Sequence, residues 1–274
     1  MGLLSDMTAS GMQRLQAARA IESVSALRER CAATPTPPRL QLSTQSFDLI
    51  AELKLRSPAL GDLSARTLDP VARLRAYAEA GAAVCSILTE PTRFDGDLSH
   101  LQQAVATLEP YGVPAMRKDF LVDPYQVLEA RAAGASGVLL IVRMVSRETL
   151  TAMLDTAAEQ GLFVLLEAFD AEDVKVAAEL ARERRGRDEQ VLMGLNSRDL
   201  QSLAIDFGRF AQLRDALPDA WPAVAESGVI TPEDAATVAR LGYRLALVGT
   251  TLMQRDDPAQ AVRELLEAGR SAAR

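Results

Sequence analysis

Lysine is scarce in this sequence, and its scarcity draws attention to side chains that could transfer protons. Only three of the 30 basic residues are lysine: Lys54, Lys118 and Lys175. A lysine ammonium can give up its proton whereas an arginine guanidinium cannot, so the lysines are candidates for acid–base chemistry. The single histidine, His100, lies in a polar stretch typical of a surface position. A Ser-His-Asp mechanism therefore has little support.

Polar residues end five of the apolar runs that we interpret as strands. They are Glu52 with Lys54, Lys118, Glu167, Asn196 (the single asparagine) and Glu226. Clustered charges of both signs shift one another's pKa values, as acid–base catalysis near neutral pH requires. Glu52 and Lys54 are two residues apart and share one strand face, so a structural ion pair is the alternative for them. Each of the others could separately cap a loop, but their number favours a shared site.

Two glycine-containing turns predict a phosphate site. Ser227-Gly228 precedes a helix start at Thr231, and Gly249-Thr250 follows the last apolar run. Backbone N–H groups in such turns, close to a helix N-terminus, form the phosphate site that recurs after strands seven and eight of barrel enzymes. The alternative is two ordinary turns, since glycine is common in them.

A repeated helix–strand pattern must position these residues. Four expected helix starts carry a capping side chain followed by proline: Asp69-Pro70, Asp123-Pro124, Thr231-Pro232 and Asp257-Pro258. Four expected helix ends carry a glycine: Gly81, Gly134, Gly161 and Gly242. Eight runs are apolar nearly throughout, as parallel strands covered by helices should be: 47–55, 82–89, 113–118, 135–142, 162–168, 191–196, 221–227 and 243–249.

Eight such units predict an α/β fold, a (β/α)₈ TIM barrel over residues 47–274. An open doubly wound sheet is the rival, but no G-x-G-x-x-G turn follows the first expected strand. Residues 1–46 are expected to form an extra N-terminal helix and a proline-containing linker, packed on the barrel within one domain of residues 1–274. The apolar residues of that helix face would be Leu4, Met7, Leu15, Ala18, Ile21 and Leu27.

The whole-chain properties exclude several classes of function. A length of 274 residues suits one barrel, and 48% hydrophobic with 24% charged residues is ordinary for a soluble protein. The net charge of −7 argues against a nucleic-acid partner. No apolar run reaches the ~18 residues of a membrane span, and no secretory signal is recognisable, so we expect a cytoplasmic protein. Cys31 and Cys85 lack metal-ligand or redox spacing.

These stretches resemble the motif set of the indole-3-glycerol-phosphate synthase family, in the family's order from about Phe47 to Met253. The matching segments are FDLIAELKLRSP, SILTEPTRFDGD, MRKDFLVDPYQ, GASGVLLIV, LLEAFD, GLNSRDL, VAESGV and LVGTTLM. The combination of K-D-F, N-x-R-D-L and E-S-G is specific to that family.

The resemblance implies a ring closure in tryptophan biosynthesis, with 1-(2-carboxyphenylamino)-1-deoxyribulose 5-phosphate as substrate and no metal or organic cofactor. It implies that Lys118 is the general acid, Glu167 the general base and Lys54 a second ammonium. Glu52, Asn196 and Glu226 would position these groups, and the resemblance also implies contacts of Ser57, Arg198 and Phe94 with substrate. The phosphate would be held by Ser227, Gly228, Gly249 and Thr250.

The sequence departs from the family pattern in and around the first βα loop. Leu55 stands where relatives have a basic residue, Ser57-Pro58-Ala59 replaces S-P-S, and the N-terminal helix lacks a lysine-rich stretch. Two alternatives therefore stay open: a duplicated synthase acting on a related substrate in specialised metabolism, and a non-catalytic barrel that binds a phosphorylated ligand. We expect a monomer or a weak homo-oligomer, with a small phosphorylated molecule rather than nucleic acid or membrane as partner.

Overall fold

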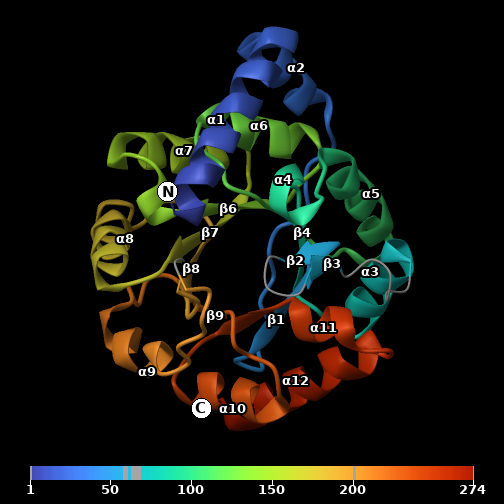
Figure 1. Cartoon of the computed structure of the whole chain (residues 1–274), viewed down its shortest axis with the longest axis vertical. Helices are drawn as coiled ribbons and strands as arrows, with labels where there is room; N and C mark the ends of the chain where they lie inside the picture. The colour runs from blue at the N-terminus through green and yellow to red at the C-terminus, as the bar shows by residue number, and fades with distance from the viewer. Residues whose placement is uncertain (1, 58–60, 63–68, 200–201, 274) are drawn as a thin grey trace.

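The computed structural model describes residues 2–57, 61–62, 69–199 and 202–273. Within these ranges eight parallel strands close into a barrel, in the order β1-β10-β9-β8-β7-β6-β5-β4 (Figure 1). The barrel strands are β1 (Asp48–Leu53), β4 (Val84–Leu88), β5 (Ala115–Lys118), β6 (Gly137–Ile141), β7 (Phe163–Ala168), β8 (Val191–Asn196), β9 (Ala223–Glu226) and β10 (Leu245–Val248). Each lies inside the range expected from its apolar run, and the predicted TIM barrel is confirmed.

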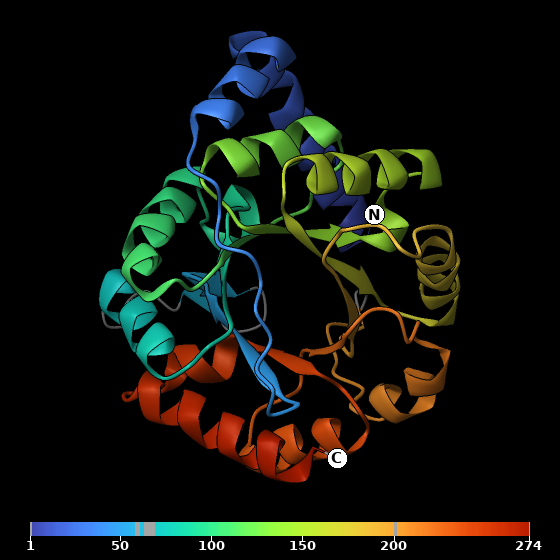
Figure 2. The same ribbon diagram turned by 180° about the vertical axis from the view of Figure 1, so that it is seen from behind.

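Helices surround the barrel, as the helix-start and helix-end signals predicted (Figures 1 and 2). The helices after β1 are α3 (Pro70–Glu79), α4 (Pro91–Phe94), α5 (Leu98–Leu108), α6 (Pro124–Ala132), α7 (Arg147–Glu159), α8 (Ala171–Glu183), α9 (Arg209–Leu213), α10 (Pro232–Arg240), α11 (Thr250–Gln254) and α12 (Pro258–Ala272). The side chains of Asp69, Asp123, Thr231 and Asp257 accept hydrogen bonds from first-turn N–H groups. The four predicted terminal glycines have positive φ angles, which glycine adopts without strain.

Shorter elements lie between the barrel strands and helices of the described ranges. Within the described ranges, 3₁₀ helices form at η2 (Glu109–Tyr111), η3 (Val142–Met144) and η4 (Arg214–Ala216). Strands β2 (Arg56–Ser57) and β3 (Gly61–Asp62) pair antiparallel in the first βα connection. No helix in the described ranges is both long enough and apolar enough to cross a membrane.

The N-terminal segment forms two helices, α1 (Leu3–Ile21) and α2 (Val24–Ala33), where one was expected. Ser23 caps α2 by accepting from the Ala26 N–H at 3.2 Å, and such a cap starts a new helix after an extended residue. Met7, Leu15 and Leu27 are buried as expected, but Ile21 is 87% exposed, so its assignment to the packed face was wrong. Ile21 is the last residue of α1, directly before the extended Glu22. Both helices lie beside α6 in Figure 1.

The core has two parts. Outward-facing strand residues such as Leu49, Ala51 and Leu166 pack under the helices, while inward-facing residues such as Ile50, Leu165 and Val224 fill the barrel interior. Alternate residues of a strand point to opposite faces, so each strand contributes to both parts. The same alternation decides which side chains reach the end of the barrel interior.

Candidate active site

The polar residues predicted from the strand ends meet in one cavity of about 400 Å³ at the C-terminal end of the barrel. The predicted site residues that line it are Glu52, Lys54, Phe94, Lys118, Glu167, Asn196, Arg198, Glu226, Ser227, Gly228, Gly249 and Thr250. Ser57 belongs to β2, and its contact with substrate stays a prediction. Pro58 and Ala59 lie outside the described residues. His100 lies on α5 and is not among the cavity-lining residues.

The period of two along each strand explains why these residues converge. Each belongs to the inward-facing row of its strand, two or four residues beyond an apolar side chain of the barrel interior. The pairs are Ile50 with Glu52, Met116 with Lys118, Leu165 with Glu167, Leu192 with Asn196, and Val224 with Glu226. In these five strands polar groups therefore take the inward positions nearest the C-terminal end. That end of a barrel is where catalytic groups are found.

Glu52 and Lys54 form a close ion pair on one side of the cavity. Lys54 Nζ lies 2.8 Å from Glu52 Oε1, and both side chains are largely buried. Burial alone would raise the pKa of the Glu52 carboxyl, but the charges of Lys54 and Lys118 outweigh it, and the pKa is lowered. Glu52 is therefore an anion that holds the Lys54 ammonium in place.

Lys118, at the end of β5, lies between two carboxylates, one from β7 and one from β9. Its Nζ is 3.5 Å from Glu226 Oε2 and 3.9 Å from Glu167 Oε1. Burial opposes the charge of Lys118, but Glu167, Glu226 and Glu52 outweigh burial and raise the pKa of the ammonium. Lys118 is therefore protonated in the free site, as a general acid must be before it acts.

Asn196 orients the carboxylate expected to act as the base. Its Nδ2 donates to Glu167 Oε1 at 2.6 Å, while its Oδ1 accepts from the backbone N–H of Arg198 at 2.9 Å. The amide is thus fixed at both ends, and Glu167 is presented in one orientation. The Arg198 guanidinium lines the cavity and donates to the Leu203 carbonyl at 2.8 Å.

Glu226 is the least satisfied of the three carboxylates. It is 1% exposed, and its Oε1 has no hydrogen-bond partner in the described part of the chain. Burial and the neighbouring charge of Glu167 raise the pKa of Glu226 well above its ordinary value, against the opposite effect of Lys118. The site thus favours a proton on this carboxyl, and an unpaired buried polar atom is typical of a functional position.

The turns after β9 and β10 form the predicted phosphate end of the cavity. Ser227 and Gly228 both have positive φ angles, 65° and 82°, which is costly for a serine. A Cβ on Gly228 would lie 2.8 Å from Ile205 Cγ2, so no larger residue fits without a shift. Gly249 precedes the first turn of α11, whose N–H groups have no partners within the helix. Phosphate binding at these turns stays a prediction.

The cavity also has an apolar wall that the strand-end reasoning missed. It includes Leu3, Leu88, Phe120, Leu139, Ile141 and Phe169, beside the expected Phe94. The rings of Phe94 and Phe120 lie 6.1 Å apart between centroids. Phe120 and Phe169 each follow a site residue, Lys118 or Glu167, by two positions, so the alternation could have indicated both. Leu3 comes from α1, and no local pattern in the sequence indicates it.

Comparison with known proteins places this geometry in a family. A family model described as Indole-3-glycerol phosphate synthase matches residues 4–265. The Indole-3-glycerol phosphate synthase of a Nocardioides species is 39% identical over 267 residues, 97% of this chain and 98% of the relative. That of Kineococcus radiotolerans is 38% identical over 277 residues, 98% of this chain and 96% of the relative. That of Methanopyrus kandleri is 40% identical over 236 residues, 85% of this chain and 88% of the relative.

Solved structures of lower identity support the fold alone. A 3-hexulose-6-phosphate synthase from Salmonella typhimurium superposes with a TM-score of 0.64 at 14% identity, covering 82% of this chain and 99% of that one. A thiamine phosphate pyrophosphorylase from Pyrococcus furiosus gives a TM-score of 0.58 at 17% identity, covering 83% and 98%. The family model and the near full-length relatives show that the chain belongs to the indole-3-glycerol phosphate synthase family.

Proposed function

We propose that the cavity binds 1-(2-carboxyphenylamino)-1-deoxyribulose 5-phosphate and closes its pyrrole ring, using Lys118 as general acid and Glu167 as general base. The activity is that of the family, a carboxy-lyase of tryptophan biosynthesis. The observation that carries the assignment of roles is the position of the Lys118 ammonium between Glu167 and Glu226, in the same cavity as the Glu52–Lys54 pair.

The site suits each chemical step. The ring carbon that bears the carboxylate attacks the ketone carbon, so a carbon–carbon bond forms while the carbonyl oxygen takes a proton from Lys118. Loss of CO₂ returns the bonding electrons to the ring. In the dehydration Glu167 removes a proton and the hydroxyl leaves as water, with Lys54 as the second acid. The apolar wall would contact the aromatic ring, and the turns at Ser227-Gly228 and Gly249-Thr250 would hold the phosphate.

The test compares two lysines. Lys118→Met should lower kcat by about 10²- to 10⁴-fold, since that is the usual contribution of a general acid. The control is Lys175→Met, because Lys175 is exposed on α8 and is not among the residues that line the cavity. The assay follows indole fluorescence from the carboxyphenylamino sugar phosphate. A folded Lys118→Met variant with the parent's kcat would exclude the acid role.

Several narrower assignments belong to the same proposal. We infer one domain over residues 1–274, which is supported by the contribution of Leu3 to the cavity. A cytoplasmic location and a monomeric or weakly associating state remain predictions. Whether Leu55 alters substrate preference is tested by Leu55→Lys, assayed with the parent substrate and a ring-methylated analogue.

A further inference from the structure

The turn that follows Lys118 is fixed by an unusually dense set of polar contacts centred on Asp119. The Asp119 carboxylate accepts from both terminal nitrogens of Arg14 at 2.8 Å, from Thr89 Oγ1 at 2.7 Å and from Arg117 Nη2 at 3.0 Å. It also accepts from the Phe120 N–H at 2.7 Å. Burial alone would raise the pKa of Asp119, but Arg117, Arg14 and Thr89 lower it to about 2. The carboxylate is therefore charged at any working pH.

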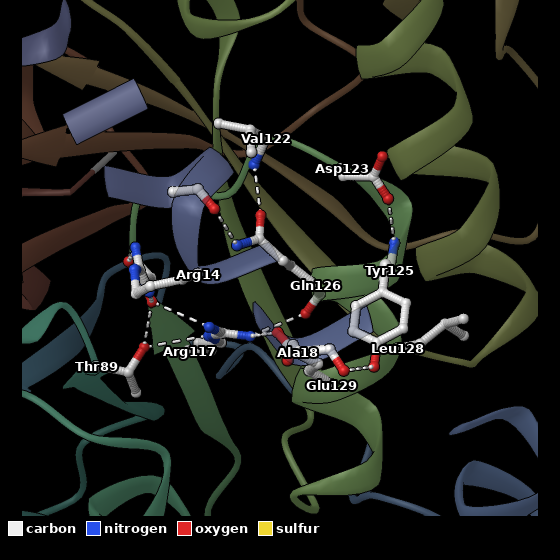
Figure 3. A network of polar contacts seen from close by, with 12 residues as sticks. Arg14, Ala18, Thr89, Arg117, Val122, Asp123, Tyr125, Gln126, Leu128 and Glu129 are labelled. Carbon is white, nitrogen blue, oxygen red and sulfur yellow. Dashed lines mark hydrogen bonds and ion pairs between the residues drawn. The ribbon is translucent and has the colours of Figure 1, made fainter. Parts of the chain in front are cut away.

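A second layer of contacts connects this cluster to α6 and α1. Arg117 donates to Thr89 Oγ1 at 3.1 Å and to the Gln126 carbonyl at 2.9 Å. Gln126 in turn donates to the Gly11 carbonyl of α1 at 3.3 Å and accepts from the Val122 N–H at 2.8 Å. Figure 3 shows Arg14, Thr89 and Arg117 converging on one point, with Gln126 reaching toward Val122.

Helix α1 also approaches the same turn through its backbone. A Cβ on Gly11 would lie 2.8 Å from the Phe120 carbonyl oxygen, so only glycine permits this contact. At its start α1 contributes Leu3 to the cavity wall. The helix therefore contacts the active site at its first turn and the segment after Lys118 along its middle.

Lys118 depends on such support because its own side-chain contacts are weak. Its distances to Glu226 and Glu167, 3.5 and 3.9 Å, are too long to fix the ammonium position. The position of the backbone at the end of β5, from which the side chain extends, therefore matters for where the ammonium lies. Arg14 is the one Asp119 partner described here that comes from outside the barrel, and its planar guanidinium grips both carboxylate oxygens.

We propose that Arg14 is a positioning residue for the reaction: through Asp119 it fixes the backbone that carries Lys118, so α1 forms part of the catalytic apparatus. The inference rests on the proposed role of Lys118. Arg14 has no direct contact with the reacting groups in this scheme, and its effect on the rate comes from the geometry that it imposes.

A matched pair of arginines on α1 tests the inference. Arg14→Gln removes the grip on Asp119, whereas Arg19→Gln removes the exposed ion pair from Arg19 to Asp123, 2.7 Å long, at the start of α6. Both tie α1 to the same region, but Asp123 is a helix cap and not a neighbour of Lys118. Arg14→Gln should lower kcat on the order of 10- to 100-fold with KM little changed, because small misplacements of a catalytic group cost this much.

Arg14→Lys should recover only part of the rate, since an ammonium keeps the charge but cannot bind both oxygens. Arg19→Gln should keep the parent's kcat. An Arg14→Gln variant with the parent's kcat would overturn the inference, and so would a rate loss equal to that of Arg19→Gln at the same melting temperature.

A spectroscopic measurement separates this inference from the proposed function. The chain contains three lysines, so lysine-selective ¹³C labelling gives few signals, and Lys118→Met identifies that of Lys118. Arg14→Gln should move the Lys118 signal and leave that of Lys175 unchanged. If the parent enzyme fails to turn over the substrate but the Lys118 signal moves, the proposed function fails and the positioning contact stands. An unmoved signal contradicts the inference.

Discussion

Two glycines at the barrel end are required for space rather than for backbone freedom. A Cβ on Gly249 would lie 2.2 Å from Glu52 Oε1 and 3.0 Å from Lys54 Nζ, and one on Gly194 would lie 2.0 Å from Glu226 Oε1. Gly194 lies within β8 and Gly249 directly follows β10, and at both a side chain would fill the volume taken by a carboxylate. Gly249 was expected to bind phosphate, and the structure adds that it makes room for the Glu52–Lys54 pair. The sequence could not indicate this, because the contact joins β1 to β10.

Gly249→Ala should therefore impair chemistry more than folding. The new methyl group must displace the Glu52 carboxylate from Lys54, and kcat should fall on the order of 10- to 100-fold. Overpacking of this size typically costs about 1–3 kcal/mol of stability. Gly208→Ala is the control, since Gly208 has a helical φ of −63° and the nearest atom to its Cβ would be Asp206 Oδ1 at 3.3 Å. Steady-state kinetics and urea unfolding of both variants provide the check, and equal kcat values would contradict the explanation.

At the scale of elements, local signals predicted almost everything that is local. The alternation of apolar residues and the caps at Asp69, Asp123 and Thr231 placed strands and helices, because these signals act within one turn or pleat. Contacts between distant segments were not predictable. The packing of α1 on the barrel places Leu3 in the cavity wall. It also brings together Arg14 and Asp119, which are 105 residues apart in the sequence. The division of the N-terminal segment at Ser23 was missed because one continuous apolar pattern was assumed.

Helix α10 is joined to the predicted phosphate turn by its capping box. Asp234 Oδ2 accepts from the backbone N–H groups of Ile230 and Thr231 at 3.0 and 2.8 Å, and Thr231 Oγ1 accepts from the Asp234 N–H at 3.2 Å. Ile230 lines the cavity two residues after Gly228. The cap therefore stabilises the helix and fixes the end of the Ser227-Gly228 turn at the same time.

Asp234→Ala should cost about 1 kcal/mol of stability, the usual value of a helix cap, and should raise KM more than it lowers kcat. The loosened turn would bind phosphate less well, so inorganic phosphate should also compete less strongly. Glu233→Ala is the control from the same helical turn, because its exposed pair with Arg240 is worth at most about 1 kcal/mol. If both variants raised KM equally, the explanation that the Asp234 cap fixes the Ser227-Gly228 turn would be wrong.

For the whole molecule, the active site is a stability cost that the rest of the fold must offset. Three buried carboxylates and two largely buried lysines lie at the barrel end, where transfer from water is expensive. Glu226 shows this cost most clearly, since it lies beside Glu167 and its Oε1 is unpaired within the described residues. Substitutions that remove such charges from a functional site often stabilise the fold.

Glu226→Gln should therefore stabilise the fold, and increasingly so as the pH rises. Burial and Glu167 raise the pKa of Glu226 in the folded state, whereas the unfolded chain loses this proton near the ordinary value of 4.5. Below pH 4.5 the Glu226 carboxyl is protonated in both the folded and the unfolded state, and its contribution to the stability of the fold is complete. Above it the unfolded state binds fewer protons, so the free energy of unfolding falls with a slope approaching about 1.4 kcal/mol per pH unit until the raised pKa is passed. Glutamine does not titrate, so in urea unfolding between pH 4 and 8 the free energy of unfolding of the variant should increase relative to that of the parent as the pH rises. A difference that stays constant over this range would show that Glu226 has an ordinary pKa in the folded protein.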